Sequence, residues 1–257
     1  MSFNADWERE AQNWIAWART PGHDAYSEYA DRFFELVPAP ARATLEIGCG
    51  EGRVSRDLGD RGHRVTAIDA SPTLLEAARA ADPAGEYVLA NAGALPFSDE
   101  TFDLVVAHNS LMDVQDMPGA VREGARVLRP EGRFCVSVVH PISDAGRFES
   151  READAPFAVR WPYFERRRVE EPFERDGLSI TFHGWAYPLE DYVRAFEDAG
   201  LAIEALREPR QREHVVAADP SEVRWQRLPM FLLLRLRKLP GPPARASVAA
   251  FEAAAPA

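Results

Sequence analysis

Three alternating glycines, Gly48, Gly50 and Gly52, constrain the fold of this chain more than any other feature. A short apolar and β-branched run at 43–47 precedes them, and a helix-like run at 54–58 follows. This order predicts a buried strand, a tight turn and a helix. Glycine reaches positive φ readily, and the absence of a Cβ lets backbone N–H groups approach a ligand closely. We therefore expect the turn to hold a ligand.

The spacing of these glycines bears on which ligand the turn holds. A dinucleotide-binding fingerprint needs glycine or alanine at position 53, but this chain has Arg53 there. A phosphate-binding loop needs Gly-Lys-Ser/Thr, which is absent from this stretch. A second apolar run, 64–68, ends at Asp69, where doubly wound folds bind the two hydroxyls of a ribose. The pattern implies a ribose-bearing cofactor and weakens the alternative of a nicotinamide-dependent (NAD) oxidoreductase.

Further motifs follow the glycine turn along the chain. They are Asp69-Ala70-Ser71, the stretch 91–97 (NAGALPF), the stretch 102–106 (FDLVV) and the stretch 128–132 (LRPEG). Together with Glu46 and the three glycines, they resemble the ordered motifs of class I S-adenosylmethionine-dependent methyltransferases, over about residues 40–140. The resemblance implies a Rossmann-like fold, S-adenosylmethionine (SAM) as cofactor and S-adenosylhomocysteine as product.

The same resemblance assigns the cofactor-binding residues. It places the methionine part of the cofactor at the glycine turn and the ribose at Asp69. It places the adenine near Asn91 and Ala92, and the sulfonium between Ala107 and His108. The residues expected to contact the cofactor in this way are Gly48, Cys49, Gly50, Asp69, Ala70, Asn91, Ala92, Ala107 and His108.

Two charged groups need partners near this turn. Glu46 stands in an apolar strand, and burying a carboxylate without hydrogen-bond donors is costly. We expect it to bind backbone N–H groups of the turn or the cofactor amine, with a structural brace as the alternative. The cofactor carboxylate needs a cation. We favour Arg19 over Arg53, because Arg53 begins a helix whose side should point away; a solvated surface role is the alternative for Arg19.

Composition limits the partners and the compartment. The net charge of −11 would repel a phosphate backbone, which disfavours nucleic acid as a substrate. Neither Cys49 nor Cys135 has a second cysteine at metal-ligand or CxxC spacing, so we expect buried thiols, a reducing compartment and no metal site. No apolar run approaches about 18 residues and the N-terminus lacks a basic region, which predicts a cytoplasmic protein without a membrane anchor.

The alternation of strands and helices predicts the fold. Nearly continuous apolar strands indicate a parallel sheet covered on both faces. We therefore expect an α/β doubly wound, mostly parallel seven-stranded sheet, with an antiparallel last strand at or near its edge. The expected strands are 43–47, 63–68, 87–90, 103–107, 133–139, 201–206 and 230–238.

We expect one methyltransferase domain over residues 1–240, built from four parts. These are a helical lid at 1–40, a cofactor-binding core at 41–140, a substrate-covering insertion after the fifth strand at 141–188, and a C-terminal helix with strands at 189–240. Residues 241–257, rich in proline, glycine and alanine, are predicted to be a disordered tail. The oligomeric state stays open.

Aromatic side chains gather in the first and third of these parts. Trp7, Trp14 and Trp17 share one helical face, which indicates either a stripe packed on the sheet or a lid over the site. The insertion carries many aromatics among charges and shows no clear periodicity, so we expect a loop-rich segment that folds over the active site. A planar or partly apolar acceptor would suit such surroundings.

Methyl transfer from a sulfonium is an in-line displacement, so the enzyme mainly aligns the acceptor and excludes water. A base is needed only for a protonated acceptor. His140 follows the fifth strand and precedes Pro141, and we favour it as that base, with His183 of the insertion second. The sequence after the fourth strand, 107–110 (AHNS), lacks the Asn/Asp-Pro-Pro-Tyr/Phe motif of base-amino methyltransferases.

These features predict methyl transfer to a small organic acceptor, in secondary metabolism, with oxygen, nitrogen or carbon as the nucleophile. The rival from another class is a SAM-binding protein that transfers no methyl group, or one that uses the sulfonium as a fixed charge. The sequence alone does not separate this rival from an enzyme, because a base is dispensable.

Overall fold

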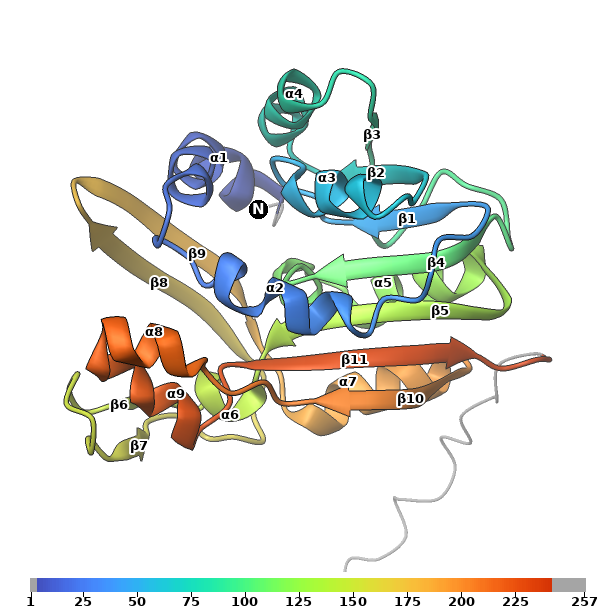
Figure 1. Ribbon diagram of the computed structural model, residues 1–257. Helices are drawn as coiled ribbons and strands as arrows, with labels where there is room; N and C mark the ends of the chain where they lie inside the picture. The colour runs from blue at the N-terminus through green and yellow to red at the C-terminus, as the bar shows by residue number, and fades with distance from the viewer. Residues whose placement is uncertain (1–3, 242–257) are drawn as a thin grey trace, which may run out of the picture.

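The computed structural model describes residues 4–241, so the tail predicted for 241–257 lies, apart from Gly241, outside the described residues. A seven-stranded sheet forms the centre (Figure 1). Across the sheet, its strands are β10 (Leu201–Arg207), β11 (Phe231–Lys238), β5 (Leu128–Val139), β4 (Phe102–His108), β1 (Thr44–Ile47), β2 (Val65–Asp69) and β3 (Glu86–Leu89).

Strand direction confirms the predicted fold. β1 runs parallel to β2 and to β4, while β11 runs antiparallel to both β5 and β10. β11 is therefore the predicted antiparallel last strand, one place in from the edge. The chain leaves β1 toward β3 on one side and returns to β4 on the other, so the strand order reverses between β1 and β4. Ligands of open α/β sheets bind at the carboxyl ends of the strands at such a reversal.

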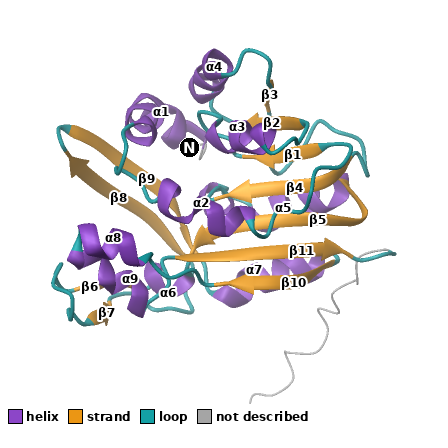
Figure 2. Ribbon diagram, in the orientation of Figure 1, coloured by secondary structure: helices purple, strands orange, loops and turns teal. Residues whose placement is uncertain are grey.

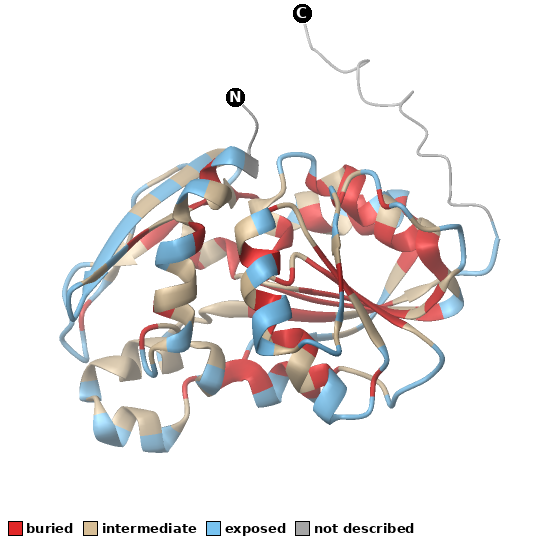
Figure 3. Ribbon diagram, turned by 90° about the horizontal axis from the view of Figure 1, so that it is seen from above, coloured by how far each residue is buried: buried red, intermediate tan, exposed pale blue. Residues whose placement is uncertain are grey.

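Helices cover both faces of the sheet (Figure 2). On one face lie α2 (Tyr26–Phe34), α3 (Arg53–Asp60) and α4 (Pro72–Ala81), and on the other α5 (Met117–Val127) and α7 (Leu189–Asp198). Phe33 and Leu58 pack on Val106 on the first face, and Phe196 packs near Phe134 on the second. All four residues of β1 are buried, as expected for a parallel strand covered on both sides. Figure 3 shows this buried centre.

The insertion is more regular than the sequence suggested. It contains α6 (Pro141–Asp144), the short pair β6 (Gly146–Phe148) and β7 (Phe157–Val159), and a long hairpin of β8 (Arg167–Arg175) and β9 (Leu178–Ala186). Asp176 and Gly177 join β8 to β9, with φ of 50° and 78°. Asp-Gly is the preferred pair for such a two-residue turn. The expectation of a loop-rich segment was therefore wrong for 167–186.

The first helix, α1 (Asn4–Arg19), does not pack on the central sheet. It lies between the hairpin and α4 (Figure 1). The rings of Trp7, Trp14 and Trp17 lie 6.4, 6.1 and 6.3 Å from that of Phe182 on β9. The tryptophan stripe thus faces the hairpin, and the alternative of a stripe packed on the sheet was wrong. The lid function of residues 1–40 stays a prediction.

The connection between β10 and β11 contains only short helices, α8 (Glu213–Ala218), η2 (Pro220–Val223) and α9 (Arg224–Arg227). They pack beside β6 and β7, where Trp225 lies edge-on to Phe148 at 5.3 Å. The remaining short helix is η1 (Leu111–Asp113), which follows β4. Over residues 4–241, no helix has both the length and the apolar character to cross a membrane.

Candidate cofactor and acceptor site

The glycine turn has the geometry predicted for it. Gly48, Gly50 and Gly52 have φ of 73°, 55° and 86°, in the left-handed region that residues with a Cβ rarely adopt. A Cβ on Gly48 would lie 2.5 Å from the Cβ of Ser110, which follows β4. The Ser110 hydroxyl donates a hydrogen bond of 2.6 Å to the carbonyl of Ile47. The end of β4 therefore closes on the turn and leaves no room for a side chain at position 48.

Asp69 is held in place beside this turn. Its Oδ2 accepts a hydrogen bond from Gly50 N at 2.8 Å, and its Oδ1 accepts one from Ser71 N at 2.9 Å. A carboxylate has about four acceptor sites, so each oxygen keeps one for a ligand hydroxyl. Burial raises the pKa of Asp69, and the backbone N–H donors oppose that shift. The carboxylate is half-buried, and its remaining acceptor sites suit the two ribose hydroxyls of SAM.

Glu46 binds a partner that the sequence did not suggest. Its carboxylate is 1% exposed and accepts a hydrogen bond from the hydroxyl of Ser55 on α3. Burial raises the pKa of Glu46 to about 7. Among the described residues, no backbone N–H of the turn donates to it. Glu46 therefore ties β1 to α3 beneath the turn, which matches the structural brace.

The two arginines near the turn occupy different places. Arg19 Nε lies 3.2 Å from Glu51 Oε2, and its Nη2 donates to the carbonyl of Ala77 at 3.1 Å. Arg53 does not point away as expected: its guanidinium lies 4.2 Å over the ring of Tyr26 and 5.3 Å from that of Trp14. Arg53 is thus the cation on the side of the turn that faces α1 and α2.

The other expected cofactor residues lie along the carboxyl ends of β3 and β4. Asn91 Oδ1 accepts from Gly93 N at 2.9 Å, which fixes the loop after β3. Ala92 is buried beside this loop. Ala107 is fully buried in β4. His108 stacks edge-on against Tyr26 and Phe33 at 5.3 and 4.8 Å, and burial lowers its pKa to about 3, which keeps the imidazole neutral.

The remaining two, Cys49 and Ala70, flank these groups in sequence. Cys49 is 6% exposed, and burial raises the pKa of its thiol well above the usual range. Ala70 is half-buried between Asp69 and Ser71. Cys135, on β5, is a fully buried thiol.

The two histidines favoured as bases differ in their surroundings. His140 Nδ1 accepts from Ile142 N at 3.1 Å and so caps α6, while its Nε2 lies 2.9 Å from Glu208 Oε1. A ring nitrogen that accepts a backbone N–H is not free to take a proton from an acceptor. His183 is buried on β9, and its carbonyl accepts a hydrogen bond from Trp7 Nε1 at 3.0 Å. The His140 ring therefore has a structural role, whereas the contact of His183 is made by its backbone, and its Nδ1 has no hydrogen-bond partner among the described residues.

Two aspartates at this edge escaped the sequence analysis. Asp113 ends η1 after β4, and Asp144 ends α6 after β5, so both follow strands of the central sheet. Burial raises the pKa of Asp113 well above its usual range and that of Asp144 to about 7. Their position after strands was the available signal, since residues just after each strand line the site.

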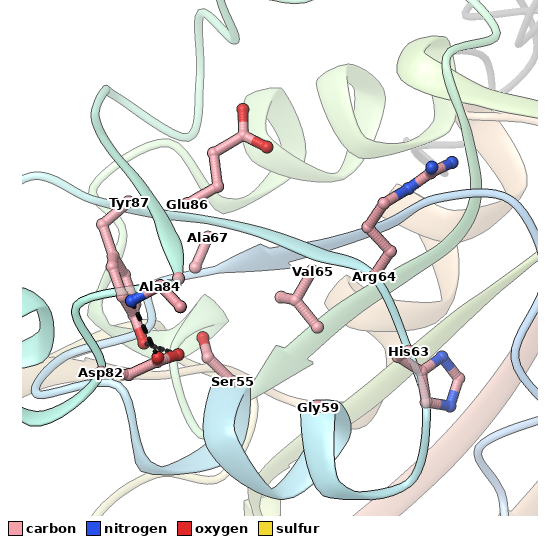
Figure 4. A pocket seen from close by; sticks show the side chains of 11 residues that line it. Ser55, Gly59, His63, Arg64, Val65, Ala67, Asp82, Ala84, Glu86 and Tyr87 are labelled. Atoms are coloured by element: carbon pink, nitrogen blue, oxygen red, sulfur yellow. Dashed lines mark hydrogen bonds between the residues drawn. The ribbon is translucent and has the colours of Figure 1, made fainter.

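Two cavities of the molecule lie away from this edge. One of about 310 Å³ lies beside α3, β2 and β3, with Ser55, His63, Asp82 and Tyr87 in its wall (Figure 4). Another, of about 610 Å³, is lined by residues that include Arg133, Glu204 and Arg235. Neither is lined by Asp69 or by a glycine of the turn.

Comparison with known proteins identifies the family. Residues 45–136 match a family model described as a methyltransferase domain. Over 182 residues, the chain is 40% identical to a malonyl-[acyl-carrier protein] O-methyltransferase of Salmonella typhimurium, which covers 69% of this chain and 68% of that protein. The chain belongs to the class I SAM-dependent methyltransferases. This membership confirms the predicted cofactor and enzyme class of the methyltransferase and removes the nicotinamide alternative.

Solved structures agree with the fold of this methyltransferase. A SAM-dependent methyltransferase from Mesorhizobium loti superposes with a TM-score of 0.67 at 24% identity, over 82% of this chain and 97% of that one. The [4+2]-cyclase SpnF superposes with a TM-score of 0.59 at 21% identity, over 93% and 95% of the two chains. At these identities the likeness concerns the fold alone.

Proposed function

We propose that this methyltransferase methylates a small organic acceptor bound between the carboxyl ends of β4 and β5 and the hairpin of β8 and β9. The observation that carries this proposal is the position of the hairpin. A Cβ on Gly184 of β9 would lie 2.9 Å from Oδ1 of Asp113, so the hairpin backbone meets the segment after β4. The hairpin thus covers the region where an acceptor would face the cofactor.

The cofactor, when bound, supplies an activated methyl group. The glycine turn would hold its methionine end, and Asp69 would accept hydrogen bonds from its ribose hydroxyls. Asn91 and Ala92 would border the adenine. For the cofactor carboxylate we now favour Arg53, because its guanidinium lies on the turn side that faces α1. Its ion pair with Asp24 would have to loosen to receive that carboxylate.

Residues 1–40 would act as the lid. Trp14 Nε1 is the nearest side-chain atom to the site of a Cβ on Gly50, at 3.2 Å. Glu8 accepts hydrogen bonds from the hydroxyls of Ser71 and Thr73, which directly follow β2. α1 therefore contacts both the glycine turn and the segment after Asp69. Cofactor exchange would require these contacts to open.

A second candidate acceptor is an acyl group carried on a protein. The similarity to a malonyl-[acyl-carrier protein] O-methyltransferase over 69% of this chain favours it. In that case the nucleophile would be a carboxylate, which needs no base. A small molecule with a protonated nucleophile would thus need a base from the protein, whereas a carrier-bound carboxylate would not.

Calorimetric titration with SAM, S-adenosylhomocysteine and NADH tests the cofactor site. We expect binding of the first two and none of NADH. Asp69→Ala should weaken S-adenosylhomocysteine binding by about 1–3 kcal/mol, because the ribose hydroxyls lose a charged partner. Asp198→Asn, at an exposed position of α7, is the matched control and should bind normally. An unchanged affinity in Asp69→Ala would refute the assignment of the ribose to this carboxylate.

A further inference from the structure

Asp113 lies where an acceptor would meet the cofactor. It ends η1, five residues beyond the end of β4, and its backbone N–H is fixed by the carbonyl of Ser110 at 3.0 Å. Ser110 in turn closes on Gly48 of the glycine turn. On the other side, Gly184 leaves room for the Asp113 carboxylate beneath the hairpin. Asp113 is thus held between the glycine turn and the hairpin of β8 and β9.

The Asp113 carboxylate has no partner that would explain its burial. Within residues 4–241, no group donates a hydrogen bond to it, and it forms no ion pair. Among the described residues, no group donates a hydrogen bond to the Asp144 side chain either. Both side chains are half-buried, so part of each remains accessible. The Asp113 carboxylate oxygens are therefore open to a ligand that donates a hydrogen bond.

A buried tyrosine of α7 is influenced by the charges of both carboxylates. Tyr192 of α7 is 1% exposed, and no hydrogen bond to its hydroxyl is found among the described residues. Burial raises the pKa of Tyr192 well above its usual range, and the charges of Asp144 and Asp113 act in the same direction. Tyr187 lies 5.5 Å from the Tyr192 ring and adds an aromatic wall.

The charged groups around Asp113 are few. Asp69 acts on it from β2 and Asp144 from α6, and both raise its pKa. α7 contributes the phenol of Tyr192, and β9 contributes the backbone at Gly184. The arginines nearby, Arg147 and Arg167, act on Asp144 rather than on Asp113.

We propose that Asp113 is the catalytic base, and that the acceptor is a protonated O–H or N–H nucleophile rather than a carboxylate. The acceptor donates its O–H or N–H hydrogen bond to Asp113. As its oxygen or nitrogen forms the bond to the methyl carbon, the carbon–sulfur bond breaks and its electron pair stays on sulfur. The proton passes to the Asp113 carboxylate. Asp144 follows β5, the parallel neighbour of β4, and we assign it a positioning role toward Asp113.

This inference rests on the proposed methyl transfer and narrows its acceptor class. A carboxylate acceptor such as a malonyl group carries no proton to transfer and would need no base at this position. An O–H or N–H group would instead donate its hydrogen bond to Asp113 and later give it the proton. The two acceptor classes of the proposed function are therefore separable by experiment.

The first arm of the test is turnover of chosen probes, followed by S-adenosylhomocysteine release. The probes are 2-naphthol for O–H, 2-phenylethylamine for N–H and the malonyl thioester of N-acetylcysteamine for a carboxylate. We expect turnover of at least one of the first two. Turnover of the malonyl thioester alone, or no turnover of either O–H or N–H probe, overturns the proposal. Failure to bind S-adenosylhomocysteine would instead refute the proposed function itself.

The second arm uses variants of the intact protein with the accepted probe. Asp113→Asn should lower kcat by about 100-fold or more, the usual contribution of a general base, with S-adenosylhomocysteine affinity unchanged. Gly184→Ala leaves the carboxylate in place but crowds it, and should lower kcat by about 10-fold. Asp198→Asn is the control. A normal kcat in Asp113→Asn overturns the proposal, and a loss of cofactor affinity equal to the loss of kcat would make Asp113 structural.

The third arm is the pH profile, which a structural role would not shift. Since Asp113 must lose its proton to act, kcat/KM should rise with pH as it ionises. Asp144→Asn removes a neighbouring negative charge, so ionisation of Asp113 becomes easier and the rising limb should move to lower pH. A limb that stays in place, with activity lowered equally at every pH, would exclude this role for Asp144.

Discussion

The cofactor side and the acceptor side of the sheet edge are built in different ways. On the cofactor side, backbone conformation sets the structure: Gly48 has no space for a Cβ, and Asp69 is fixed by two backbone N–H groups. On the acceptor side, half-buried side chains such as Asp113 and Asp144 come from short helices after the strands. Backbone geometry tolerates few substitutions, whereas side chains on the acceptor side can change without altering the fold.

The two sides also differ in how firmly they are packed. β1 is buried at all four positions, whereas most residues of β8 are exposed (Figure 3). Regions with few buried contacts open at a lower free energy than the core. The hairpin and α1 are therefore the parts of this methyltransferase suited to open for a ligand.

Gly48→Ala should have the largest effect. The new Cβ would meet Ser110 at 2.5 Å, and the backbone would stay at a φ of 73°. Together, strain and overpacking should cost about 2–5 kcal/mol of unfolding free energy. Urea unfolding measures this loss, and calorimetry should show that S-adenosylhomocysteine binding falls with it.

Gly22→Ala is the matched control for this change. Gly22 has a similar φ of 78°, but a Cβ there would meet nothing within 4 Å. Gly22→Ala should therefore lose only the part of the unfolding free energy that comes from backbone strain, about 1–2 kcal/mol. If the two variants lose the same stability, the close approach of Ser110 is not what requires glycine at position 48.

The pH dependence of Glu46 should give the next largest effect. Its folded pKa of about 7 lies above the ordinary 4.5, so the folded state holds a proton that the unfolded state releases. Its contribution to stability is thus full below pH 4.5 and is lost as the pH rises to 7. In Glu46→Gln this loss is absent. The stability of the variant relative to the parent should therefore increase by about 2–3 kcal/mol across that window.

Urea unfolding of both proteins between pH 4.5 and 7.5 measures this difference. Gln keeps an oxygen that can accept from Ser55, so the hydrogen bond across β1 and α3 is retained. Glu76→Gln, at an exposed position of α4, is the control and should follow the parent at every pH. A difference between Glu46→Gln and the parent that does not vary with pH would show that Glu46 is ionised in the fold.

The cofactor side could be predicted closely from the sequence. The glycine turn, the strands around it and the helix capped by Ser71 all lie within a few residues of their expected places. These elements depend on local rules of backbone conformation and burial. β5 is the main difference, since it begins at Leu128 rather than at 133. Pro130 and the positive φ of Glu131 are typical of a turn, which hid the start of the strand.

The acceptor side could not be predicted as well, for two physical reasons. β8 carries charged residues on both faces and so lacks the alternation that identifies a strand, although Asp176-Gly177 marked its turn. Asp113 and Asp144 look like ordinary surface acids in sequence, because only the fold shows that they lie unpaired beside the hairpin. His140, in contrast, follows β5 as expected, yet its ring caps α6.

Trp7→Phe should have the smallest effect and tests whether α1 holds the hairpin. The change removes the hydrogen bond from Trp7 Nε1 to the carbonyl of His183, while a ring remains to face Phe182. Loss of one such bond should lower the free energy that keeps the hairpin closed by about 1 kcal/mol. We expect the hairpin to open separately from the sheet, so hydrogen exchange of β9 amides should accelerate about fivefold while the urea midpoint stays nearly constant. Trp225→Phe, on α9, is the control for ring size. Equal acceleration in both variants would show that α1 does not hold the hairpin of β8 and β9.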